Sequence, residues 1–209
     1  MKGIKGTHKL QYIFTGTPRS GTGYISQLLT SAGVPIGHEM FYGMPGAGFF
    51  PKNAVGDSSW LAVPSLKNYK KEQIFHIVRD PLKTITSLYR IRCLEDVNLV
   101  KNSYSNFKAI HLPEIMKYEG LDRYIFFWLV WNDVAAKEAS GTYKLENIVK
   151  NPKTFLKKIG IDPGDRKLFT KVYNQLPKDK YFTLKDLKNC DKGLLKNLKA
   201  ASKRYGYNI

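Results

Sequence analysis

The chain has 209 residues, enough for one sizeable domain with its own hydrophobic core. Its hydrophobic content of 43% and charged content of 24% are ordinary for a globular protein, and its two cysteines, Cys93 and Cys190, have the spacing of neither a disulfide framework nor a zinc site. The net charge of +17 is high and favours anionic partners such as phosphorylated cofactors, acidic glycans, nucleic acid or anionic lipid heads.

The first half of the chain shows strand and helix patterns in alternation. The first 14 residues contain no apolar core long enough for a signal peptide. The patterns that follow predict a buried strand at 9–15, a glycine-rich loop at 16–23, a helix at 23–33, a short strand with its exit loop at 34–41, a loop at 43–56 and a basic helical stretch at 64–72.

The second half continues the alternation. It predicts a strand at 73–81, a helix at 81–95, a polar loop at 93–110, largely helical structure at 113–139, a strand running into a turn at 141–148 and a helix at 151–160. Strands that alternate with helices indicate a parallel sheet covered on both faces. We therefore expect a single domain over 1–209 with a three-layer α/β/α architecture around a central parallel sheet.

The C-terminal part, 161–209, is rich in lysine and is expected to be mostly helical. Residues 151–209 carry 15 Lys and Arg against 5 Asp, a net charge of +10. This excess fits either a solubilising face or a surface that binds polyanions. The longest apolar run, 124–131, is too short to span a bilayer, so we expect no transmembrane segment and, with reduced thiols, a cytoplasmic location.

The loop after the first strand, "TGTPRSGTGY", has the features of an anion site. Free backbone N–H groups at the start of a helix, together with the helix dipole, favour a negative ligand. Gly16 and Gly21 have the spacing of a nucleotide-binding loop, but Thr22 stands where its lysine belongs and Gly23 where its metal-binding hydroxyl belongs. The cation is instead Arg19, inside the loop, so the pattern favours phosphate binding without the metal chemistry of nucleotide hydrolysis.

This loop resembles the 5′-phosphosulfate-binding loop of sulfotransferases that use 3′-phosphoadenosine 5′-phosphosulfate (PAPS). The resemblance implies a P-loop-containing nucleotide hydrolase-like fold. It also implies that Arg19 contacts the 5′-phosphate and the bridging oxygen of the leaving group. Tyr24 takes the place of a tryptophan that stacks on adenine in cytosolic members. The residues that would wrap the 5′-phosphate are Ser20, Gly21, Thr22 and Gly23.

A second motif, "HIVRDPLKTITSLYR", lies at the end of the strand predicted at 73–81. Arg79 leaves the strand, and Ser87 lies about two helical turns further on, so both can reach one phosphate. Asp80 and Pro81 are expected to fix the turn between them. This motif also resembles the sulfotransferase family, and the resemblance assigns Arg79 and Ser87 to the 3′-phosphate of PAPS.

A third segment, "YKLENIVKNPKTFLKKIGI", is similar to the family's Y-E-D-[LM]-x-x-[ND]-P stretch. Glu146, Asn147 and Pro152 match, whereas Leu145 replaces a tyrosine. The matches together span about residues 10–160. The arginine-lysine-glycine segment that cytosolic members carry near the C-terminus is absent, so C-terminal lysines are expected to take its place.

Sulfuryl transfer to a hydroxyl requires a base for the acceptor proton. By resemblance, the stretch "IGHEMF" supplies it, with Glu39 as the first candidate and His38 as the second. A further stretch, "VGDSSWLAVPSL", resembles a segment between the base and the R-D-P strand in bacterial members. Its residues Asp57, Ser58 and Trp60 are candidates for contact with the acceptor.

The sequence therefore predicts a PAPS-dependent sulfotransferase that acts on a carbohydrate or other alcohol, which may carry acidic groups, and that releases 3′,5′-adenosine bisphosphate (PAP). This function implies no metal, and no dedicated nucleic-acid partner is expected. Two alternatives remain open at this stage. They are a P-loop kinase for a nucleoside or small molecule, and a non-catalytic relative that binds polyanions.

Overall fold

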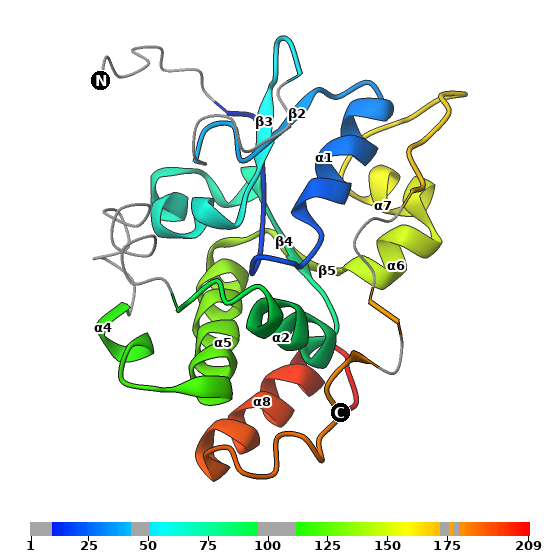
Figure 1. The fold of residues 1–209 in the computed structure, drawn as a ribbon. Coiled ribbons are helices and arrows are strands. Elements are labelled where there is room, and N and C mark those ends of the chain that lie inside the picture. The colour runs from blue at the N-terminus through cyan, green and yellow to red at the C-terminus, as the bar shows by residue number, and fades with distance from the viewer. Residues whose placement is uncertain (1–9, 43–50, 96–111, 172–175, 178–179) are drawn as a thin grey trace.

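The computed structural model of the chain describes residues 10–42, 51–95, 112–171, 176–177 and 180–209 (Figure 1). Residues 43–50 of the loop predicted at 43–56 and residues 96–110 of the loop predicted at 93–110 lie outside these described residues. Within the described residues, no helix has both the length and the apolar character needed to cross a membrane.

Five parallel strands form one sheet, in the order β2-β3-β1-β4-β5. The strands are β1 (Tyr12–Thr15), β2 (Ile36–His38), β3 (Gly56–Ser58), β4 (Ile74–Val78) and β5 (Gly141–Lys144). Because all of them run in the same direction, every strand delivers its following loop to the same edge of the sheet.

Helices cover both faces of this sheet (Figure 1). The α-helices are α1 (Thr22–Ser31), α2 (Pro81–Arg90), α4 (Leu112–Ile115), α5 (Gly120–Glu138), α6 (Leu145–Lys150), α7 (Pro152–Lys158) and α8 (Lys192–Arg204). Two 3₁₀-helices, η1 (Trp60–Asn68) and η2 (Lys71–Gln73), precede β4. The predicted α/β class and the parallel sheet between helical layers are therefore confirmed.

The two faces are packed by two separate apolar clusters. Alternate residues of a strand point to opposite faces, so Ile13 joins the cluster with α2, α5 and α8, while Phe14 joins the cluster with α1, α6 and α7. The first cluster includes Trp128 and Trp131 of α5, both fully buried.

Three elements differ from the sequence prediction. β3 was missed because its residues, Gly-Asp-Ser, carry no apolar side chain, although all three are buried. The stretch predicted as helical at 64–72 belongs to two 3₁₀-helices, the first of which contains Pro64. In the described part of 161–191 there are turns but no α-helix, so the helical prediction for the beginning of the C-terminal part was wrong.

The loops after β1 and β4 leave the sheet toward opposite faces. β1 leads into α1, which packs in one cluster through Ile25 and Leu28, and β4 leads into α2, which packs in the other through Ile85 and Leu88. Adjacent parallel strands whose following helices diverge leave a crevice between their loops, and ligands in open α/β sheets bind there. The two predicted phosphate motifs flank this crevice.

Candidate functional site

The loop between β1 and α1 is tightly enclosed at two glycines. A Cβ on Gly16 would lie 2.1 Å from the carbonyl oxygen of Ile77, and a Cβ on Gly21 would lie 2.6 Å from both methyl carbons of Leu145. Gly21 also has a φ of +101°, a conformation that side chains other than glycine rarely adopt. The loop backbone thus sits directly against β4 and α6, with no room for larger residues.

The start of α1 has polar groups that no described protein group satisfies. No side chain caps this helix at Gly21, and its first turn contains no acidic residue. The hydroxyls of Thr17 and Ser20 are buried and, among the described residues, have no hydrogen-bond partner. Buried hydroxyls normally find a partner, so these groups are free to donate to an anion bound in the loop.

Arg19 lies at the apex of this loop, with a positive φ of 71°. Its Nε donates a hydrogen bond of 2.8 Å to Oγ of Ser87 on α2. Burial lowers the pKa of Arg19, and the nearby positive charge of Arg79 lowers it further. The loop therefore holds a half-buried cation close to a second cation, an arrangement that an anion between them would stabilise.

Arg79 follows β4 and extends toward the same point. Its Nη1 donates to the carbonyl oxygen of Arg19 at 3.1 Å, and its Nη2 donates to the hydroxyl of Tyr181 at 3.2 Å. Within the described residues, no carboxylate forms an ion pair with either arginine. The resemblance assigned Arg19 and Arg79 to two ends of one cofactor, and the structure places them in direct contact, with Ser87 bonded to Arg19.

The turn that presents Arg79 is fixed by hydrogen bonds from three directions. The carboxylate of Asp80 accepts the N–H of Lys83 at 3.0 Å and so caps α2, which begins at Pro81. The N–H of Asp80 donates to Glu146 Oε1 at 3.0 Å, and the Tyr207 hydroxyl donates to Glu146 Oε2 at 2.7 Å. Burial raises the pKa of Tyr207, which keeps this hydroxyl protonated as a donor.

Tyr181 is a site residue that the sequence prediction missed. Its ring lies 6.0 Å from the guanidinium carbon of Arg79 and 5.7 Å from Nζ of Lys83. The segment is tied to α2 because the N–H of Phe182 donates to Oγ1 of Thr86 at 2.8 Å. A tyrosine in a lysine-rich stretch is the only sequence signal for this role, and it is too weak to have identified the residue.

The two candidate bases lie at the end of β2, on the far side of β3 from the arginines. Glu39 has a φ of 56°, and one of its carboxylate oxygens lies 3.7 Å from Nε2 of His38. Burial raises the pKa of Glu39, and a hydrogen bond from the Trp60 side chain partly offsets this. Burial lowers the pKa of His38, whose Nε2 lies 3.3 Å from Oγ1 of Thr22. Thr22 therefore links the base region to the first turn of α1.

The other candidates for acceptor contact have structural partners. Asp57 is fully buried and accepts the N–H groups of Met40 and Phe41, each at 3.1 Å. Ser58 is also fully buried and donates to the carbonyl oxygen of Thr22 at 2.8 Å. In this structure both side chains hold the loop that carries Glu39 and the start of α1, and neither is exposed to an acceptor.

Two aromatic candidates also pack inside the protein. Tyr24 is 7% exposed, with its ring 6.0 Å from that of Phe169, so it is not presented to a nucleotide base in this structure. Trp60 is half-buried, with its ring 5.8 Å from that of Trp131. Stacking of Tyr24 on adenine and of Trp60 on an acceptor remain predictions.

Comparison with models of known protein families gave no match for this chain, and comparison with curated proteins gave none. In the described residues, no group of three or more His, Cys, Asp or Glu side chains is placed to hold a metal ion. The interpretation of the candidate site therefore rests on the residues described above. Two arginines, Ser87 and the uncapped start of α1 lie at the crevice, and Glu39 lies two strands away.

Proposed function

We propose that this chain is a PAPS-dependent sulfotransferase with a P-loop-like site, which transfers a sulfuryl group to an acceptor hydroxyl. The observation that carries the proposal is that Arg79 donates to the carbonyl oxygen of Arg19 while Arg19 donates to Ser87, with no ion-paired carboxylate on either arginine among the described residues. Two cations next to unpartnered loop hydroxyls fit a ligand with more than one anionic group. Thr22 and Gly23, in place of lysine and a metal-binding hydroxyl, favour PAPS over a magnesium–nucleotide complex.

The residues of the crevice fit the two phosphate groups of this donor. The 5′ side would be held by the loop from Ser20 to Gly23, by Arg19 and by the start of α1. The 3′-phosphate would be held by Arg79 and Ser87, with Lys83 close to the same point through its contact with Tyr181. Arg19 donates a hydrogen bond to the hydroxyl of Ser87. We therefore expect an anion that binds this hydroxyl to compete with Arg19 for it.

When bound, PAPS would supply an activated sulfuryl group, whose bond to the 5′-phosphate oxygen breaks as the acceptor oxygen attacks sulfur. Arg19 would neutralise the negative charge that develops on the leaving phosphate oxygen. Glu39 would accept the proton of the acceptor hydroxyl. Its raised pKa makes it a stronger base than an ordinary carboxylate, and the Trp60 hydrogen bond fixes its position.

Binding of the product PAP tests the donor site by isothermal titration calorimetry. We expect Arg79→Ala to weaken PAP at least about 100-fold, because a guanidinium makes two charge-assisted hydrogen bonds to phosphate. Arg79→Lys should recover part of the affinity, since lysine keeps the charge but not the planar fork. Arg204→Ala, on α8, is the control and should bind PAP normally. A chain that binds no PAP, or hydrolyses ATP with magnesium instead, would overturn the proposal.

Transfer of labelled sulfate from PAPS to a panel of glycans, lipids and phenols tests the chemistry. Glu39→Gln should lower kcat by about 100-fold or more while leaving PAP affinity unchanged, as expected for a lost general base. The wild-type rate should rise with pH, and the rise should lie above the usual titration range of a glutamate because burial raises this pKa. If His38→Ala instead abolishes the rise and Glu39→Gln does not, the base is His38.

A further inference from the structure

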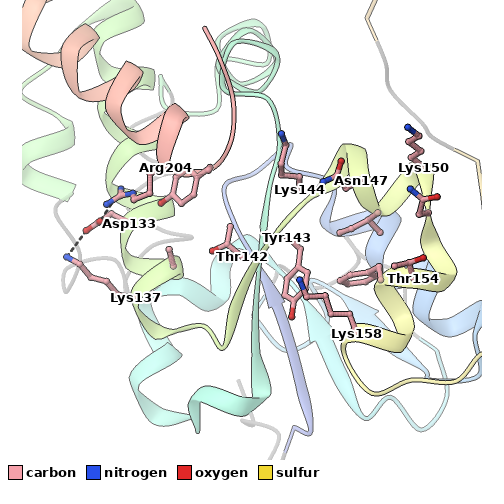
Figure 2. Close-up of a pocket in the computed structure, with 15 residues that line it drawn as sticks. Asp133, Lys137, Thr142, Tyr143, Lys144, Asn147, Lys150, Thr154, Lys158 and Arg204 are labelled. Atoms are coloured by element: carbon pink, nitrogen blue, oxygen red, sulfur yellow. Dashed lines mark hydrogen bonds and ion pairs between the residues drawn. The ribbon is translucent and has the colours of Figure 1, made fainter.

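The outer edge of β5 opens onto a pocket of 860 Å³ (Figure 2). Helices α6 and α7 form one side of this pocket, and α5 and α8 form the other. Neither Arg19, Arg79 nor Ser87 lines it. The sheet therefore has a second hollow, separate from the crevice between β1 and β4.

β5 is an edge strand, and within the described residues no strand pairs with its outer side. The N–H of Ser59 donates to the carbonyl oxygen of Phe14 at 2.9 Å, so Phe14 faces β3 and its neighbours Ile13 and Thr15 face β4. Phe14 lies beside Phe75 in the register, so alternate residues of β4, among them His76, face β5. Because His76 lies beside Thr142, it pairs with Gly141 and Tyr143. Thr142 then directs its N–H and C=O groups, and Lys144 its N–H, away from β4 toward the pocket, where another chain can pair with them.

Positive side chains surround this edge, and they differ between the two sides. On the α5 and α8 side, Asp133 forms ion pairs with Lys137 at 2.6 Å and with Arg204 at 3.5 Å. On the α6 and α7 side, Lys150 and Lys158 are exposed and have no ion-pair partner in the described residues. The lysines of the second side are therefore available to a negatively charged ligand (Figure 2).

We propose that the outer edge of β5 binds an acidic segment of a partner protein as an additional β-strand. The unpaired edge supplies main-chain hydrogen bonds, which give affinity in strand addition. Lys150 and Lys158 supply the charge preference. Because the side chains of a strand alternate between its faces, acidic residues at every second position would all point toward these two lysines. The intervening residues would face Asp133 and should be uncharged.

Two other occupants fit these observations less well. A second copy of this chain would bring its own basic edge against Lys150 and Lys158, and a chain with a net charge of +17 repels itself. A nucleic acid offers negative charge but cannot form a strand ladder with Thr142 and Lys144. The open edge and the one-sided charge together favour an acidic peptide.

The proposal is tested with a labelled octapeptide of alternating glutamate and valine, titrated against the full chain by fluorescence polarisation. One control peptide has the same composition with its four glutamates in succession, and another has the alternating sequence with N-methylated backbone groups. We expect each control to bind at least about tenfold more weakly, because one loses the side-chain alternation and the other the main-chain hydrogen bonds. Hydrogen exchange at the amide of Thr142 should slow when the alternating peptide binds.

Charge-reversal variants provide a matched pair on one helix. Lys158→Glu should weaken the alternating peptide about tenfold or more through local charge repulsion, whereas the adjacent exposed Lys157→Glu, which does not line the pocket, should weaken it much less. Equal effects of the two variants would overturn the proposal. So would equal binding of the three peptides, tighter binding of an oligothymidylate, or a dimer in sedimentation that Lys158→Glu dissociates.

Discussion

At the carboxyl ends of β1 and β4, two arginines are oriented by hydrogen bonds to neutral partners, whereas Lys150 and Lys158 beside β5 are exposed, with Lys158 Nζ 5.5 Å from the ring of Tyr143. Arg19 is held by Ser87, and Arg79 by a carbonyl group and by Tyr181. Lys150 and Lys158 have no such hydrogen bonds in the described residues and are exposed. Planar guanidiniums with fixed positions suit recognition of a specific phosphate, while mobile ammonium groups suit attraction of negative charge in general.

This difference shows that the number of cations in a region does not by itself identify a site. Most of the net charge of this chain comes from lysines of its C-terminal part, yet the candidate catalytic region uses only a few positive side chains. That region differs in how its groups are held in place. Glycines bring the loop backbone close to β4 and α6, and Asp80 caps α2. Among the described residues no carboxylate forms an ion pair with either arginine. The following predictions test whether the two regions differ in this way.

The largest effect is expected for Gly21→Ala. The new Cβ would meet both methyl groups of Leu145 at 2.6 Å in a left-handed backbone conformation, so the buried Leu145 side chain or the loop after β1 must shift. We expect PAP affinity to fall by about 100-fold and stability to fall by about 3 kcal/mol, the sum of strain and overpacking. Gly160→Ala is the matched control, because Gly160 also has a positive φ but nothing lies within 4 Å of its Cβ. Similar PAP affinities in both variants would show that the loop is not tightly enclosed.

The second prediction concerns His76 on β4, whose side chain is hydrogen-bonded to Thr142 on β5. It is fully buried between Asn132 and Thr142, and burial lowers its pKa to about 4. The ordinary pKa of histidine is about 6.5, so as the pH falls the unfolded chain takes up a proton before the folded chain does. The free energy of unfolding should therefore drop by up to about 3 kcal/mol between pH 6.5 and 4. Thermal unfolding of wild type and His76→Asn across this range measures the effect. An equally steep pH dependence in the variant would contradict it.

A smaller effect is expected from salt. Binding of the acidic peptide at β5 should weaken about tenfold between 50 and 300 mM NaCl, since exposed charges are screened within a few ångströms at high salt. Binding of PAP should weaken about threefold, because Arg19 is half-buried and its contacts are less accessible to ions. Titrations of the same protein at four salt concentrations provide the comparison. Equal slopes for the two ligands would remove the distinction between the regions.

The smallest effect is expected for Tyr207→Phe. Loss of the hydroxyl removes the 2.7 Å hydrogen bond to Glu146, which in turn positions the N–H of Asp80. The same O–H is shared with the carbonyl oxygen of Val78 at 3.2 Å, so the variant loses one donor that serves two acceptors. We expect stability to fall by about 1 kcal/mol and PAP affinity to fall about threefold, because the effect on the site is indirect. Tyr89→Phe, at an exposed tyrosine on α2, is the control for the general effect of removing a hydroxyl. Unchanged PAP affinity in Tyr207→Phe would show that Glu146 positions the turn without help.

Local patterns of the sequence were sufficient to predict most of the fold. β1, β4 and α1 were recognised because apolar runs and helical spacing are local signals, and Gly33 and Gly160 ended their helices as predicted. β3 could not be recognised, because Asp57 is buried through hydrogen bonds to residues that come 16 and 17 positions earlier. A buried carboxylate in a strand has no hydrophobic signature.

The sequence motifs identified candidate site residues, but they did not predict which of these residues contact one another. Arg19, Arg79 and Ser87 were identified from spacing, but the direct contact of Arg19 with Ser87 depends on how two loops meet at the crevice. Tyr181 reaches Arg79 across 102 residues of sequence, so no local pattern could assign it. Asp57 and Ser58 were predicted to contact the acceptor, and the structure buries both side chains against backbone partners that sequence alone cannot reveal.

The hydrogen bond from Tyr207 to the carbonyl oxygen of Val78, 129 residues away, has a consequence for how the chain folds. Contacts between distant positions form late, because the intervening chain must first lose its freedom. The turn that presents Arg79 is therefore completed only when Tyr207 has docked beside β4. An anion bound at this turn would hold together segments that are far apart in the sequence. It would raise the unfolding temperature of the whole molecule and protect the segment around Tyr181 from proteases.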